Sequence, residues 1–63
     1  MIKEFDELAI TNENYDKLTA TERKQRTQKR YELIKKMNEK EIEELLKRPY
    51  PSQFKMKIKE LRN

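Results

Sequence analysis

Residues 21–37 read TERKQRTQKRYELIKKM, and this stretch decides how the rest of the chain is interpreted. Its first half, residues 23–30, carries five cationic side chains and no apolar one. Its second half adds four apolar side chains, those of Tyr31, Leu33, Ile34 and Met37. A helix without an apolar stripe cannot be held by a hydrophobic core. We therefore expect the first half to project from the fold or to meet a partner, and its charge indicates a polyanion.

The composition predicts one small all-α domain that spans residues 1–63. Of the 63 residues, 33% are hydrophobic and 44% are charged, so the core is thin and dimerisation or folding against a partner stays open. Helix formers dominate and glycine is absent, which favours a bundle of three to four short helices. The chain has no Cys and no His, so we expect neither a metal nor a cofactor.

Charge is distributed unevenly along the chain. Residues 1–22 hold two cations against six anions, residues 23–40 hold eight against two, and residues 41–63 hold six against four. This pattern divides the domain into an acidic N-terminal arm (1–18), a basic central helical region (19–48) and a C-terminal helix (49–63).

The acidic arm has its apolar residues at helical spacing, at Ile2, Phe5, Leu8 and Ala9. We interpret it as a terminal helix that closes the core, with a short strand as the weaker alternative. The other hypothesis is that the arm binds a protein partner or folds back over the basic stretch. The polar segment 11–19 reads as a loop or short turn, which Tyr15 and Leu18 are expected to attach to the core.

Two capping patterns predict where the central helices begin. Thr19 and Glu22 have the spacing of a capping box, with Thr21 as a competing cap. Further on, one long helix to about residue 47 is an alternative to a break at residues 37–39. We favour the break, with Asn38 capping a second helix over residues 39–48.

Pro49-Tyr50-Pro51 ends this helix, because proline lacks the backbone donor and restricts the residue before it. Ser52 is then the expected cap of a last helix that carries Phe54, Ile58 and Leu61. The run FKMKIK also alternates with period two, so an edge strand remains the alternative. Residues 39–61 would make a helix-turn-helix-like C-terminal half.

Nucleic acid is the partner that these features favour, with DNA favoured over RNA because an α-helix fits the major groove. On the central helix the cations would neutralise phosphates and a glutamine would reach phosphates or base edges. On the C-terminal helix two lysines would line the outward side of a recognition helix. These nucleic-acid-binding candidates are Arg23, Lys24, Gln25, Arg26, Lys29, Arg30, Lys55 and Lys59.

The alternative function is a protein interaction module that inhibits or recruits a larger partner. Tyrosines are enriched at binding hot spots, so Tyr31 and Tyr50 are its candidate contacts, and self-association into a homodimer suits either function. We expect no enzyme, because no His or Cys is available as a base or nucleophile. No apolar run approaches the length of a membrane span, so no membrane role and a cytoplasmic location are expected.

Overall fold

Four α-helices follow one another along the chain in the computed structural model, which describes residues 1–63. No strand is present, and this confirms the predicted all-α fold of short helices. A single 3-10 turn, η1, lies between the first two helices. The bounds are α1 (Ile2–Glu7), η1 (Tyr15–Lys17), α2 (Ala20–Lys36), α3 (Glu39–Leu46) and α4 (Ser52–Arg62).

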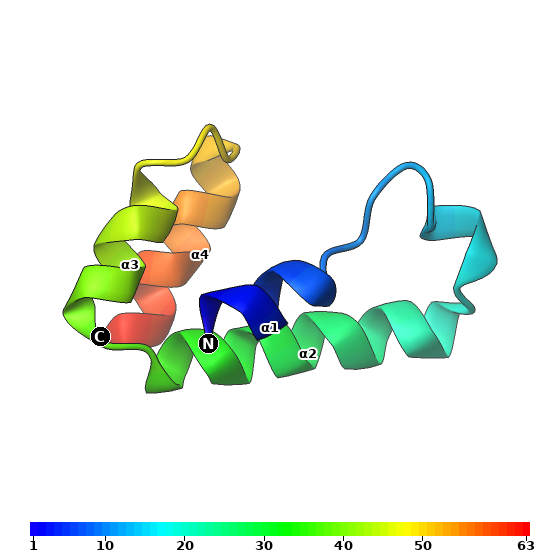
Figure 1. Ribbon diagram of the computed structural model, residues 1–63, viewed down its shortest axis with the longest axis horizontal. Coiled ribbons are helices and arrows are strands. Elements are labelled where there is room, and N and C mark those ends of the chain that lie inside the picture. The colour runs from blue at the N-terminus through cyan, green and yellow to red at the C-terminus, as the bar shows by residue number, and fades with distance from the viewer.

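The longest helix, α2, runs along the long axis of the molecule (Figure 1). Helices α3 and α4 stand side by side over its C-terminal half and run in opposite directions (Figure 1). The N-terminal half of α2 extends beyond this helical hairpin, and only α1 and the loop with η1 lie over it (Figure 1). The first half of the basic stretch therefore projects from the hairpin, but it does not project from the fold as a whole, because α1 and the loop with η1 cover one side of it.

The capping box predicted at the start of α2 is present. The backbone N–H of Glu22 donates to Thr19 Oγ1 at 3.1 Å, and the N–H of Thr19 donates to Glu22 Oε1 at 2.9 Å. The hydrogen bond from the Thr19 backbone lowers the pKa of the Glu22 carboxyl below its ordinary value. Thr19 rather than Thr21 is therefore the cap of this helix.

The predicted break after α2 is also confirmed, and a single long helix is excluded. Met37 has an extended backbone with ψ of 148°, and Asn38 then caps α3. Its side chain accepts from the N–H of Glu41 at 2.9 Å, and the Glu41 carboxylate accepts from the N–H of Asn38 at 3.2 Å. Helix α3 ends at Leu46, two residues before the predicted end.

The C-terminal segment is a helix, so the edge-strand alternative is wrong. The predicted cap is also wrong, because Pro51 is the N-cap of α4 and Ser52 is its first helical residue, without a side-chain cap bond. The ring of Pro51 fixes φ, here −57°, and its ψ of 148° gives the extended backbone that a cap position needs. The preceding turn thus starts the helix without help from a side chain.

One hydrophobic core holds all four helices together. Its buried members are Phe5, Ile34, Met37, Ile42, Leu45 and Ile58. Phe5 is fully buried, so α1 closes the core as predicted, and a strand in this arm is excluded. Tyr15 does not reach this core: its side chain is 51% exposed and lies against Arg23 instead. None of the helices combines the length and the apolar character needed to cross a bilayer.

Candidate nucleic-acid interface

Arginines and lysines have different roles in this chain. All five arginines donate hydrogen bonds to acceptors elsewhere in the molecule: Arg23, Arg26, Arg30, Arg48 and Arg62. Of the eleven lysines, one forms a salt bridge, between Lys47 and Glu43 at 3.4 Å on the exposed surface. The arginines therefore stabilise the fold through hydrogen bonds, whereas the lysines other than Lys47 form no salt bridge.

Arg26 and Arg30 attach α1 to α2. The last four carbonyls of a helix lack partners within the helix. In α1, backbone N–H groups of the next residues satisfy Glu4 and Asp6. The other two carbonyls are satisfied by α2: Arg30 Nε donates to Phe5 O at 3.2 Å and Arg26 Nη1 to Glu7 O at 3.3 Å. Positive charge at a helix C-terminus is also favourable against the helix dipole.

Arg30 is the more deeply placed of these two arginines. Its guanidinium carbon lies 3.9 Å from the ring centroid of Phe5 and 5.5 Å from that of Phe54. Partial burial lowers the pKa of Arg30 from the ordinary arginine value, because removal from water disfavours the charged form. This side chain is therefore part of the interior and offers little to an external partner.

The remaining three arginines connect other elements of the fold through hydrogen bonds. Arg23 Nη1 donates to Tyr15 O at 3.0 Å and to Leu18 O at 2.6 Å, which fixes η1 against the start of α2. Arg48 forms two hydrogen bonds with the Asp6 carboxylate, at 2.6 and 3.2 Å, and this contact raises the pKa of Arg48. Arg62 donates to carbonyls at the C-terminus of α2, Ile34 O at 3.3 Å and Lys35 O at 3.0 Å.

The predicted central site is thus divided between two sides of α2. Arg23, Arg26 and Arg30 lie at helical spacing on the side that continues into Ile34 and Met37, and they are half-buried. The other three candidates, Lys24, Gln25 and Lys29, are exposed. The signal that separates them is the spacing of the arginines at i, i+3 and i+7, which places them on the face of the core.

The outward face of α2 consists of two parallel stripes, each with residues at i, i+4, i+7 and i+11. We name them by their third residues. The Tyr31 stripe is Lys24, Gln28, Tyr31 and Lys35, and the Glu32 stripe is Gln25, Lys29, Glu32 and Lys36. All four lysines are exposed and none forms a salt bridge, although the chain has twelve carboxylates.

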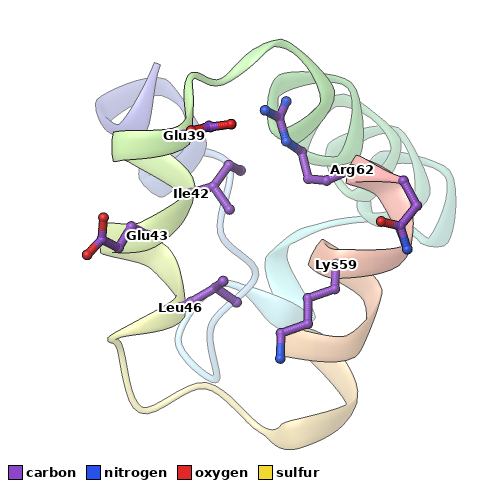
Figure 2. A pocket seen from close by; sticks show the side chains of 7 residues that line it. Glu39, Ile42, Glu43, Leu46, Lys59 and Arg62 are labelled. Carbon is purple, nitrogen blue, oxygen red and sulfur yellow. The ribbon is translucent and has the colours of Figure 1, made fainter.

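The candidates on α4 lie apart from those on α2. Lys59 lines a groove between α3 and α4 (Figure 2). Lys55 precedes it by four residues, which is about one helical turn, and so lies on the same face of α4. Lys57, which is on another face, lies over the Tyr31 ring at 5.3 Å. Because α4 packs against α2 and runs beside α3, it does not project as a free recognition helix.

The groove between α3 and α4 has an apolar floor and charged walls, with a volume of about 380 Å³. Ile42 and Leu46 form the floor (Figure 2). Two acidic residues of α3, Glu39 and Glu43, line one side of it, and two basic residues of α4, Lys59 and Arg62, line the other. The Glu39 side chain points toward α4, whereas that of Glu43 points away from the groove (Figure 2).

Tyr50, the second predicted partner contact, is held within the fold. Its ring packs edge-to-face on Phe54 with centroids 4.8 Å apart, and its hydroxyl accepts a hydrogen bond from Arg48 at 3.0 Å. Tyr31 is half-buried between α2 and α4.

No cluster of three or more acidic side chains suited to a metal ion is present. No family model, curated protein or solved structure matches this chain. The fold and the site together define a small four-helix protein whose longest helix presents a lysine-bearing outward face.

Proposed function

We propose that this protein binds nucleic acid through the outward face of α2. The observation that carries the proposal is the set of four exposed lysines on this face, Lys24, Lys29, Lys35 and Lys36, none of which is paired with a carboxylate. Like charges on one helix repel one another, so the helix is more stable when a polyanion neutralises them.

The dimensions of α2 suit a phosphate backbone. The helix has 17 residues, which corresponds to a length of about 25 Å. Each lysine that neutralises a phosphate releases a counterion, and this release supplies most of the affinity at low salt. Gln25 and Gln28 lie between the lysines and offer hydrogen bonds to phosphates or base edges.

The first prediction concerns these lysines. Replacing all four with Gln should weaken binding to DNA and RNA oligonucleotides at least tenfold at low salt, and the dependence on salt should become shallower because fewer counterions are released. Fluorescence anisotropy at two salt concentrations measures both effects. The fold should persist, since these side chains make no ion pair and lie outside the core.

A matched control separates this face from total charge. Replacing Lys3, Lys17, Lys40 and Lys47 with Gln removes the same four charges, and it takes the net charge from +4 to 0 as the first variant does. The control should retain most of the binding. Equal losses in the two variants would contradict the assignment to α2, and a wild-type protein that retains no nucleic acid at low salt would overturn the proposed function.

A protein partner is the second candidate, and the groove between α3 and α4 favours it. An apolar floor between walls of opposite charge suits an amphipathic segment of another protein. Replacing Leu46 with Lys would place a charge on that floor. Loss of a nuclease-resistant protein complex in this variant, with nucleic-acid binding unchanged, would support this function; an unchanged complex would argue against it.

A further inference from the structure

A second groove lies between α2 and α4, and it contains the only aromatic side chain of the outward lysine-bearing face. It has a volume of about 360 Å³, within the range of sites that accept small organic groups. Its lining residues are Gln28, Tyr31, Glu32, Lys35 and Leu61. Three of these belong to the Tyr31 stripe, so the groove is continuous with the proposed phosphate-binding face.

The Tyr31 ring lines this groove and offers a surface for stacking. The side chain of Tyr31 is half-buried. Leu61 of α4 lines one side of the groove, and Gln28, Glu32 and Lys35 of α2 line the other. Lys57 extends from α4 over the ring, with Nζ 5.3 Å from the centroid. A base that stacks on this face would take the place of the Lys57 ammonium group. Proteins stack the bases of single strands on aromatic rings that have cations close by.

Cations surround this ring along the direction of α2. Lys24 lies two turns before Tyr31 and Lys35 one turn after it on the same stripe, and Lys57 lies opposite on α4. Glu32 is the single carboxylate among the lining residues. Phosphates on either side of a stacked base would therefore meet positive charge.

We propose that the groove between α2 and α4 binds an unpaired base of a single-stranded nucleic acid, with Tyr31 as the stacking surface. This inference rests on the proposed function and specifies its substrate. In a duplex both faces of each base are stacked on neighbours, so an aromatic side chain that lines a groove cannot stack on them. An unpaired base presents a free face, and stacking is tolerant of base identity.

The test compares two substitutions of one ring. Tyr31→Leu removes the π surface but keeps apolar volume, whereas Tyr31→Phe keeps the ring. With a twelve-residue oligothymidylate, Tyr31→Leu should bind about tenfold more weakly than wild type, and Tyr31→Phe should bind within about twofold. With an abasic oligomer of the same length, all three proteins should bind alike, because only the phosphates remain.

Two pairs of lysines form a further matched control. Lys24→Gln with Lys35→Gln removes two charges from the Tyr31 stripe, and Lys29→Gln with Lys36→Gln removes two from the Glu32 stripe. The first pair should lose more affinity for oligothymidylate than the second. Equal losses from the two pairs would overturn the assignment of the strand to this groove.

A measurement on the wild-type protein avoids any effect of substitution on folding. The ring protons of Tyr31 should shift upfield in NMR spectra on addition of oligothymidylate and should not shift with the abasic oligomer. Absence of this shift during saturating binding, or equal affinity of Tyr31→Leu and wild type, would overturn the stacking inference and leave the proposed function intact. Failure of the wild type to bind either oligomer would overturn the stacking inference, and failure to bind duplex DNA at low salt as well would overturn the proposed function.

Discussion

The guanidinium of Arg30 contacts the N-terminal arm in two ways at once. It stacks on the Phe5 ring at 3.9 Å and donates through Nε to the carbonyl of the same residue at 3.2 Å. A planar, delocalised cation can stack and donate together, whereas the compact ammonium of lysine cannot. This difference explains why the arginines of α2 lie under the arm and its lysines remain in water.

We expect Arg30→Lys to destabilise the fold although it preserves the charge. Loss of the stacked contact and of the hydrogen bond should reduce the free energy of unfolding by about 1–2 kcal/mol. Urea denaturation followed by circular dichroism measures the change. Lys29→Gln on the exposed face is the control and should stay within about 0.5 kcal/mol of wild type. A midpoint for Arg30→Lys equal to that of wild type would contradict a structural role for the guanidinium.

The ends of the helices follow from contacts within a few residues. Thr19 with Glu22 and Asn38 with Glu41 each close a reciprocal pair of hydrogen bonds across three residues. These bonds satisfy donors that the first turn of a helix leaves unpaired. The two boxes therefore mark the starts of α2 and α3 independently of the rest of the molecule.

Two threonines near the start of α2 provide a direct comparison. Thr19→Ala should lower stability by about 1 kcal/mol, because it removes the oxygen that accepts from the Glu22 N–H. Thr21→Ala should be neutral or slightly stabilising, since this exposed residue lies inside the first turn and Ala is the better helix former. Thermal melts of the two variants measure these changes in stability. A larger loss of stability in Thr21→Ala than in Thr19→Ala would mean that Thr19 is not the cap of α2.

The whole chain depends on a core of six buried residues, to which every helix contributes. Helix α1 has only six residues and would not form alone, so its docking is part of the global fold. Asp6 and Arg48, which pair although 42 residues apart, connect α1 to the turn after α3. The N-terminal arm is therefore an integral element and not an appendage.

Phe5→Ala should for this reason unfold the whole molecule and not only the arm. Truncation of a fully buried phenylalanine costs about 3–5 kcal/mol, which is comparable to the total stability of a domain of this size. Circular dichroism should show loss of helicity well beyond the six residues of α1. Met56→Ala is the control, since Met56 is 68% exposed and should melt as wild type does. Retention of the helicity of α2, α3 and α4 in Phe5→Ala would show that the arm is dispensable.

The elements of this protein were largely predictable from its sequence. The all-α class, the break at Asn38, the capping boxes and the proline turn depend on hydrogen bonds and backbone restrictions that span a few residues, so local patterns predict them. The prediction for Ser52 was wrong because two local signals competed and the backbone of Pro51 alone sufficed to start α4.

Helical spacing places Arg23, Arg26 and Arg30 on one side of α2, but only the tertiary structure decided that this side serves the fold. The acceptors of Arg26 and Arg30 lie 19 and 25 residues away in sequence, on carbonyls that exist as free acceptors only after α1 has formed and docked. Charge alone does not distinguish these arginines from Lys24 and Lys29, because all are cationic side chains on one helix. The distinction depends on which side of the helix the arm covers, and that is a property of the packed molecule.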